Sequence, residues 1–318
     1  MRILITGANG FLGSHLVERA LKKGHEVFAA LRVGADQSNL DHLTAYEVVD
    51  IDYTSVETIE ATFKDTPPFD LIIHNAGLTK SYTMERYIQV NVTLTKNLLQ
   101  VIQNKGLLNE NGIFAYISSL ASIGPLGHEG PASNYGRSKV LAEQAIIASG
   151  VNYMIYRPTG IYGERDLQFV PLIKSVKLGI YPLMTSAEHK MTLINAKDVA
   201  ENVIECSLKH KNEIVHLEDG EIYLHKDLKE TLETLLEKKS GNLSVPKFLV
   251  KSLLFCSDVI DRTLNRTPKL SLEHYSEISQ DWDYDFSDER KRIPLSIEYT
   301  LQEGFQEAIN FYVKNELI

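Results

Sequence analysis

The chain has 318 residues, of which 43% are hydrophobic and 24% charged, and its formal net charge is −9. This size and composition predict a soluble globular protein of one large or two modest domains. The chain carries no block of Lys and Arg, and contacts to a phosphate backbone need clustered positive charge, so nucleic acid is excluded as the main partner. No apolar stretch reaches about 18 residues, and Met1–Ile5 is too short for a signal peptide. We therefore expect no membrane contact and a cytoplasmic location.

The two cysteines, Cys206 and Cys256, belong to no CxxC motif and to no Cys/His ligand pattern. Such isolated cysteines are typical of buried thiols in a reducing compartment. The sequence therefore predicts no metal site.

Short apolar runs alternate with longer helical patterns through the first half of the chain. Strands are predicted at Ile3–Thr6, Val27–Leu31, Glu47–Val49, Leu71–His74, Ile113–Ile117 and Tyr153–Arg157, and helices at Phe11–Lys23, Ser55–Phe63, Arg86–Asn104 and Asn134–Ser149. This alternation predicts parallel strands with helices on both faces. The expected fold is therefore α/β, with a Rossmann-type doubly wound sheet.

The alternation of strand and helix patterns ends near residue 160, and beyond it prolines separate the predicted elements. Helical patterns recur at Ala196–Cys206, Lys226–Leu236, Val245–Leu264 and Thr300–Lys314. We expect a first domain over residues 1–160, to which a strand and a helix from about 190–206 are added. Residues 161–318 then form a smaller, mostly helical portion.

A glycine-rich turn follows the first predicted strand and opens the first predicted helix. Its glycines, Gly7, Gly10 and Gly13, have the spacing Gly-x-x-Gly-x-x-Gly. Gly7 suits a tight turn, Gly10 lets the backbone approach a diphosphate, and Gly13 allows close packing of helix on strand. The helix N-terminus then offers free N–H groups to the anion. Residues 1–160 are thus predicted to bind a dinucleotide, and 161–318 mainly the substrate.

The end of the second predicted strand indicates which dinucleotide is bound. NAD sites usually place an acid there, whereas NADP sites place an arginine near the 2′-phosphate. This strand ends in Leu31-Arg32, and the next acid, Asp36, comes only after Gly34. Arg32 therefore favours NADP(H), with NAD(H) as the alternative.

Tyr135 and Lys139 stand four residues apart, which places both on one face of the predicted helix. A fixed ammonium beside a phenol lowers the pKa of the phenol, so the phenol can exchange a proton with an alcohol or a carbonyl near neutral pH. Lys139 would also hold the ribose hydroxyls. The pair predicts proton chemistry coupled to hydride transfer at a nicotinamide.

Two further segments lie at the edge of the sheet where ligands of α/β proteins bind, and one helical residue is expected near them. Ser118-Ser119 follows the fifth strand, and a hydroxyl there can polarise a carbonyl. His74 ends the fourth strand and is expected to be structural, whereas Asn75-Ala76-Gly77 provides small residues where a cofactor passes close to the backbone. Asn91 is a candidate anchor for a kink or a water near the lysine.

Together these motifs resemble the extended short-chain dehydrogenase/reductase superfamily, whose members are often described as NAD-dependent epimerases/dehydratases. The resemblance covers nearly the whole chain and is strongest from Met1 to about Asp198. The matching pieces stand in the family's order: Thr6 to Gly13, Asp50-Ile51, His74 to Gly77, Asn91-Val92, Ser118-Ser119, Tyr135-x-x-x-Lys139, Arg157 to Gly163, and Asp198 to Ala200.

The resemblance implies roles for individual residues. The catalytic hydroxyl in the family is the second of the serine pair, so the implied catalytic residues are Ser119, Tyr135 and Lys139. Asp50 and Ile51 would border the adenine, and Arg157 to Ile161 the nicotinamide and the substrate. The full expected cofactor set is Gly7, Asn9, Gly10, Phe11, Leu12, Gly13, Arg32, Asp50, Ile51, Asn75, Ala76, Gly77, Asn91, Tyr135, Lys139, Arg157, Pro158, Thr159, Gly160 and Ile161.

Departures from the family pattern narrow the expected activity. The acid pair of sugar dehydratases is absent, because Leu120-Ala121 follows Ser119. Leu94-Thr95 stands where the family often has Gly-Thr, and this departure puts little of the resemblance in doubt. The segment from Arg157 to Asp166, followed by Val170-Pro171, looks most like the 3β-hydroxysteroid dehydrogenase and dihydroflavonol-4-reductase branch.

Three functions are consistent with these observations. The first is an NAD(P)-dependent dehydrogenase or reductase that acts on a hydroxyl or keto compound. The second is a sugar-nucleotide epimerase that uses the same Tyr and Lys, and the third is a non-catalytic dinucleotide-binding scaffold or sensor. Family members commonly pair the helices at Arg86–Asn104 and Asn134–Ser149 with their copies, which implies a homodimer.

Overall fold

The computed structural model describes residues 1–126, 130–183, 188–244 and 279–318, together with residues 246, 248, 250–252, 254, 255, 259 and 275. Cys256 and most of the helix predicted at Val245–Leu264 lie outside these residues.

Seven strands form one parallel sheet in the order β11-β6-β5-β4-β1-β2-β3. They are β1 (Arg2–Thr6), β2 (Glu26–Arg32), β3 (Tyr46–Ile51), β4 (Phe69–His74), β5 (Leu108–Ile117), β6 (Tyr153–Pro158) and β11 (Glu213–Leu217). The strand order reverses between β1 and β4, which is the switch point at which doubly wound sheets bind ligands. The predicted Rossmann-type fold is confirmed; β11 is an additional strand.

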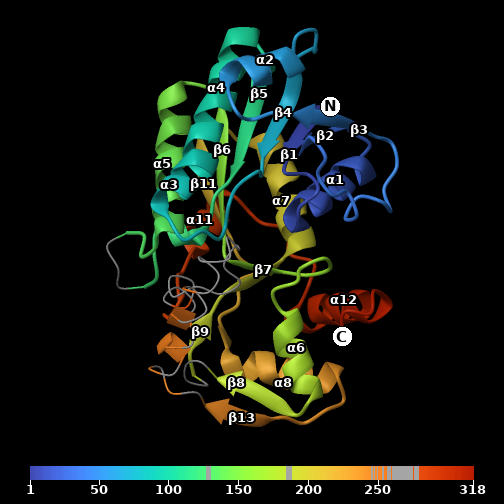
Figure 1. Ribbon diagram of the computed structural model, residues 1–318, viewed down its shortest axis with the longest axis vertical. Coiled ribbons are helices and arrows are strands. Elements are labelled where there is room, and N and C mark those ends of the chain that lie inside the picture. Colours follow the sequence, from blue (N-terminus) through green and yellow to red (C-terminus); the bar gives the residue numbers. More distant parts are fainter. Residues whose placement is uncertain are drawn as a thin grey trace.

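Helices cover both faces of this sheet (Figure 1). One core lies under α1 (Phe11–Lys22) and α7 (Ala196–Lys209), and the opposite core under α2 (Val56–Thr62), α4 (Leu94–Lys105) and α5 (Asn134–Ser149). The central strands β1 and β4 and the second half of β5 are almost entirely buried, as expected when both faces are covered.

The helix predicted at Arg86–Asn104 consists of three consecutive segments. These are α3 (Met84–Tyr87), a π-helical segment η1 (Ile88–Thr93) and α4. The sequence does not indicate the π segment, because its apolar residues continue the helical period. A π segment widens the helix locally and is frequent at functional sites.

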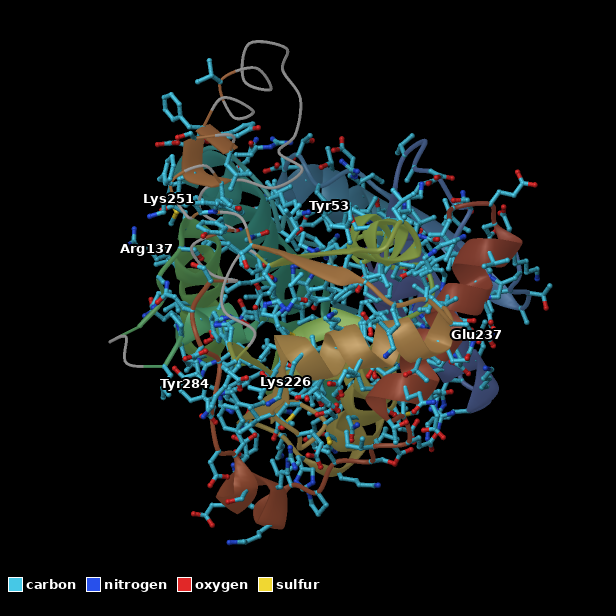
Figure 2. The ribbon with its side chains drawn as sticks, turned by 90° about the horizontal axis from the view of Figure 1, so that it is seen from below. Tyr53, Arg137, Lys226, Glu237, Lys251 and Tyr284 are labelled. Atoms are coloured by element: carbon cyan, nitrogen blue, oxygen red, sulfur yellow. The ribbon has the colours of Figure 1, made fainter. Side chains whose placement is uncertain are left out.

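A third core lies beyond β7 (Gly160–Tyr162), in the lower part of Figure 1. Its helices are α6 (Val170–Lys177), α8 (His225–Leu235) and α12 (Leu301–Lys314), and it includes the stacked rings of Tyr162 and Phe305. Seen from below, Lys226 lies at the start of α8 and Glu237 lies just beyond its end (Figure 2). The short helix α11 (Ser287–Arg292) lies beside β11.

The expectation of a mostly helical second portion was incomplete. The described residues of this portion form three two-stranded sheets: β7 with β10 (Leu193–Asn195), β8 (Ile180–Leu183) with β13 (Gly241–Ser244), and β9 (Lys190–Met191) with β12 (Tyr223–Leu224). These strands have two to four residues, too few to show an alternating pattern. The helix α6 was also missed, although Pro171 suits its first turn. None of the helices in the described part of the chain is long and apolar enough to cross a bilayer.

Candidate active site

The glycine-rich turn between β1 and α1 is folded so tightly that it leaves no room for a side chain at Gly7 or Gly13. A Cβ on Gly13 would lie 2.0 Å from the carbonyl oxygen of Gly7, and Gly7 has φ +63° and packs against Ala76. Gly10 caps α1 without a side-chain hydrogen bond, and the first turn of the helix, which begins with Phe11 and Leu12, contains no acid. The uncapped N–H groups and the helix dipole therefore form a cradle for an anion, and this cradle fits a dinucleotide diphosphate.

The expected adenine side of the cradle is formed by the ends of β2 and β3. Arg32 is exposed and pairs in register with the buried Ile51, while Asp50 is exposed beside Leu31. The side chain of Asn9 donates to the backbone oxygen of Asp36. The Asp36 carboxylate is bound to Ser38, so it turns back on its own loop.

His74 lies at the end of β4 in a buried chain of hydrogen bonds. Its Nδ1 lies 2.8 Å from the Thr6 hydroxyl and its Nε2 lies 3.0 Å from the Thr95 hydroxyl. Thr95 donates to the backbone oxygen of Asn91, so it accepts from Nε2, while Thr6 accepts from the Ala76 N–H and donates to Nδ1. Burial, assisted by Lys139, lowers the pKa of His74 to about 3. A neutral imidazole with both nitrogens bonded has a structural role.

Asn91 lies in the π segment and is buried. Its amide donates to the Leu78 carbonyl and to the Ser138 hydroxyl, and its Oδ1 accepts from the Leu78 N–H. Asn91 thereby ties the loop after β4 to α5. Its Oδ1 and the Lys139 ammonium approach Gly77 from the same side, because a Cβ on Gly77 would lie 3.3 and 3.4 Å from them.

Lys139 is a buried cation on the inner face of α5. Its Nζ donates to the Ile117 carbonyl at 2.8 Å and lies 4.8 Å from the ring centre of Tyr116 and 5.8 Å from that of Tyr135. Burial lowers the pKa of Lys139 to about 8, while the charge of Glu143 raises it. The ammonium therefore lies at the edge of the sheet, beside the phenol with which it was predicted to act.

Tyr135 is half-buried in the first turn of α5, with its ring 6.1 Å from that of Tyr87. The next residue, Gly136, packs on η2 (Leu120–Ser122) so closely that a Cβ would lie 2.2 Å from the Ala121 carbonyl oxygen. This contact brings the start of α5 against the segment that begins at Ser119. The Ser119 hydroxyl accepts from the Ala121 N–H at 3.1 Å, which leaves its proton for donation.

The two adjacent serines have different environments. Ser118 is buried and donates to Glu143, whereas Ser119 is half-buried and caps η2. The geometry therefore favours Ser119 as the serine that could reach a ligand.

The side chain of Arg157 is bound to a carboxylate of α5. Its guanidinium donates twice to Glu143, at 3.0 and 2.6 Å, because a buried carboxylate needs a cation to balance its charge. The side chain is thus held behind the serines. The backbone of Pro158 to Ile161 lies at the edge of the sheet. The Thr159 hydroxyl has no hydrogen-bond partner within the described residues.

Sequence reasoning missed two further polar residues, Lys80 and Asp166. Asp166 follows β7 and is 2% exposed, and burial raises its pKa to about 6 although Lys80 lowers it. Burial lowers the pKa of Lys80, which follows β4. Neither residue lies in a recognisable motif, so only the three-dimensional structure shows that they interact.

The sheet order and the phosphate cradle define a dinucleotide-binding α/β protein. A family model described as "NAD dependent epimerase/dehydratase family" matches residues 3–223. The chain belongs to this family and is an enzyme of the extended short-chain dehydrogenase/reductase type.

Curated relatives include both epimerases and oxidoreductases. A UDP-glucose 4-epimerase of Vibrio cholerae is 26% identical and covers 98% of this chain and 95% of its own. A ceramide reductase of Caulobacter vibrioides is 28% identical over 64% of this chain and 59% of its own. A 3β-hydroxysteroid dehydrogenase/Δ5→4-isomerase of Mycobacterium tuberculosis is 31% identical over 56% of this chain and 52% of its own.

Solved structures share the fold across the whole chain. A UDP-glucose 4-epimerase from Thermotoga maritima, solved with UDP-glucose, has a TM-score of 0.79 at 17% identity and covers 99% of this chain and 100% of its own. A dTDP-glucose 4,6-dehydratase from Bacillus anthracis, solved with NAD, has a TM-score of 0.76 at 17% identity over 99% and 97%.

Proposed function

We propose that the protein is an NAD(P)-dependent oxidoreductase that interconverts a hydroxyl and a keto group, with Tyr135 as the acid/base. The observation that carries this proposal is the position of Lys139. Its buried ammonium lies between the Ile117 carbonyl, Gly77 and the Tyr135 ring, at the carboxyl ends of β4 and β5. A cation held there stabilises the deprotonated phenol and so prepares it for proton exchange.

Each of the three side chains has a separate part in the reaction. A bound nicotinamide supplies the hydride acceptor or donor. The Tyr135 oxygen takes the proton of a substrate hydroxyl, or gives one to a carbonyl. The Ser119 hydroxyl donates a hydrogen bond to the reacting oxygen, and the Lys139 ammonium holds the phenolate charge.

The test is a screen of NADPH and NADH oxidation against ketones, aldehydes and UDP- or GDP-sugars, followed by Tyr135→Phe on the substrate found. Loss of the acid/base should lower kcat by at least about 100-fold, while dinucleotide affinity stays within about threefold. Near-full turnover by Tyr135→Phe would show that another group carries the proton.

NADP(H) is the proposed cofactor, and NAD(H) the alternative. Arg32 ends β2 exposed, in register with Ile51, and Asp36 is turned toward Ser38. The cradle would use Gly7 to Gly13, and Asn75 to Gly77 would border the dinucleotide on the other side. Arg32→Ala should reduce the NADPH/NADH preference in kcat/KM by about tenfold or more. An unchanged preference would remove the argument from Arg32.

Sugar-nucleotide epimerisation is the second candidate, because the relative from Vibrio cholerae spans nearly the whole chain. An epimerase would use Tyr135 and Lys139 in the same way, with no net turnover of the dinucleotide. A UDP-sugar that is converted to its epimer without consuming added NAD(P)H would favour this candidate over the oxidoreductase.

Two proposals concern the rest of the molecule. The portion around the third core, residues 161–318 without α7 and β11, would complete the substrate site. We also propose a homodimer through α4 and α5, which lie side by side (Figure 1) and expose Leu141 and Ile147 on α5. Light scattering on wild-type protein and on Leu141→Lys/Ile147→Lys should give a dimer and a monomer, respectively.

A further inference from the structure

One face of α5 points at the end of β5. Tyr135, Lys139 and Glu143 follow one another at intervals of four residues, so they lie one above the other on the same side of the helix. Lys139 and Glu143 are 5% and 3% exposed. Arg137 lies on the outer side of α5 (Figure 2). Glu143 therefore belongs to the same row as the two residues proposed to carry the proton chemistry.

The last residues of β5 and the residue after them contact this row one by one. The Ile117 carbonyl accepts from Lys139, and the Ser118 hydroxyl donates to Glu143. Ser119, the next residue, presents the hydroxyl proposed to donate to the substrate. Glu143 thus fixes the residue that lies between the anchor of Lys139 and the hydroxyl of Ser119.

We propose that Glu143 is a positioning residue for the proton-transfer site: through Ser118 it fixes the end of β5, and through its charge it keeps the Lys139 ammonium protonated. The proposal deepens the proposed function and rests on it, because it assigns a task to a residue behind the Tyr135–Lys139 pair.

The Glu143 carboxylate is itself held firmly from the opposite side. Arg157 on β6 donates to both of its oxygens, and one of these oxygens also accepts from Ser118. The Arg157 guanidinium lies 3.5 Å from Nε2 of His216 on β11, whose Nδ1 lies 2.8 Å from Glu289 on α11. A chain of polar contacts thus connects the end of β5 with the C-terminal segment.

Glu143 is one of several groups that face Lys139. The rings of Tyr116 on β5 and Tyr135 on α5 lie within 6 Å of the ammonium, and the neutral His74 on β4 lies behind it. Burial lowers the pKa of Lys139 to about 8, and the Glu143 charge counteracts this. Burial raises the pKa of Tyr116 and lowers that of His74, so both are neutral near pH 7, and Glu143 is the carboxylate in this set whose removal changes the charge around Lys139.

The variant Glu143→Gln tests the proposal, because it keeps the shape of the side chain and removes its charge. The measured quantity is the pKa of Lys139. It is obtained from the pH dependence of the Lys139 13Cε resonance in protein labelled with [13C]lysine, and this resonance is assigned by its absence in Lys139→Met. We expect the pKa of Lys139 to fall by about one unit, as expected for the loss of a charge one helix turn away in a protein interior. A resonance that titrates as in the wild type would overturn the proposal.

Glu289→Gln is the matched control, since it breaks the outer end of the same chain without touching Ser118 or Lys139. It should lower thermal stability and leave the pKa of Lys139 unchanged. A purely structural network would instead give both variants the same behaviour.

Glu143→Gln leaves the half-buried Arg157 without its carboxylate, which can prevent folding. The double variant Glu143→Gln/Arg157→Gln leaves no unpaired charge behind. It should still lower the pKa of Lys139, though by less, because Glu143 lies one turn from Lys139 on α5 and Arg157 lies beyond Glu143 on β6. An unchanged pKa in the double variant overturns the proposal in the same way. The titration needs no substrate, so its outcome is separate from that of Tyr135→Phe, which tests the proposed function.

Discussion

The ammonium nitrogen of Lys139 lies 2.8 Å from the carbonyl oxygen of Ile117, at the end of the strand that leads to Ser119. Within the described residues no carboxylate lies within ion-pair distance of this nitrogen. The cation is instead surrounded by a carbonyl and by the rings of Tyr116 and Tyr135. A buried ammonium in such surroundings costs stability, and this cost has measurable consequences.

The variant Lys139→Met should therefore be more stable than the wild type near pH 7 while it loses activity. The pKa of Lys139 is lowered from 10.5 to about 8, chiefly by burial. This pKa difference corresponds to a destabilisation of the folded state by about 3 kcal/mol, which Lys139→Met relieves. The variant also loses the hydrogen bond to Ile117, which offsets about 1 kcal/mol of the gain. Urea denaturation at pH 7 should show a net gain of about 2 kcal/mol.

The stability gain of Lys139→Met should depend on pH. Between the two pKa values the unfolded chain holds a proton that the folded chain lacks, so wild-type stability rises with pH there. The advantage of Lys139→Met is therefore complete below pH 8 and shrinks as the pH approaches 10.5. Lys96→Met, at an exposed position of α4, should show neither the gain nor the pH dependence.

Sequence reasoning located the sheet and the Tyr135–Lys139 pair on α5 for identifiable physical reasons. The helix Asn134–Ser149 was predicted at its observed bounds, and it begins after the Ser133 cap and ends at Gly150 with φ +78°. The strands β1, β2 and β4 are buried over most of their length and appear as nearly uninterrupted apolar runs. Such local signals do not depend on distant contacts.

What was missed depends on contacts between distant segments. The spacing of Lys139 and Glu143 indicates a shared face, but not that Arg157 on β6 would bind Glu143. The pairing of strands as short as Tyr223–Leu224 is likewise decided by the neighbouring strand. Only tertiary structure supplies these partners.

Gly13→Ala should abolish dinucleotide binding. The new Cβ would lie 2.0 Å from the backbone oxygen of Gly7, and neither atom can move without shifting the turn or α1. We expect at least about a 100-fold loss of affinity for NAD(P)H, measured by fluorescence titration, and a stability loss of about 1–3 kcal/mol. Gly241→Ala is the control, since the nearest atom would be 4.0 Å from its Cβ. Wild-type affinity in Gly13→Ala would show that the turn does not hold the diphosphate.

Glu18→Gln should destabilise the protein only above acidic pH. Burial raises the pKa of Glu18, but hydrogen bonds from Lys22 and Arg165 outweigh it, and the net pKa lies well below its ordinary value. The Arg165 pair, 2.8 Å long, fastens the loop after β7 to α1. A folded pKa below the unfolded one gives stability that is complete above about pH 4.5 and is lost as the pH falls toward the folded value.

Thermal melts from pH 3 to 8 measure this effect. Because the pair is partly exposed, we expect a loss of only about 1 kcal/mol at pH 7, and a smaller one at pH 3. Glu110→Gln, at an exposed position of β5, should follow the wild type throughout. A loss that is the same at pH 3 and pH 7 would mean that the Glu18 charge does not contribute.

Asn91→Ala should detach the loop after β4 from the site. The Asn91 side chain bonds both the N–H and the carbonyl of Leu78 and also the Ser138 hydroxyl, and it is 1% exposed. Alanine leaves these groups unpaired, which costs about 2–4 kcal/mol by denaturant unfolding. Because Gly77 lies directly before Leu78 and faces Lys139, turnover should fall further than the folded fraction explains.

Asn91→Asp tests the two hydrogen bonds that the Asn91 amide donates. Aspartate keeps the acceptor for the Leu78 N–H but replaces two donated hydrogen bonds by repulsion between its oxygen and the Leu78 carbonyl, and it should be at least as destabilising as alanine. Asn104→Ala, which removes an exposed contact with Glu60, serves as the control and should cost less than about 0.5 kcal/mol. Wild-type stability in Asn91→Ala would show that the π segment, rather than this side chain, holds the loop.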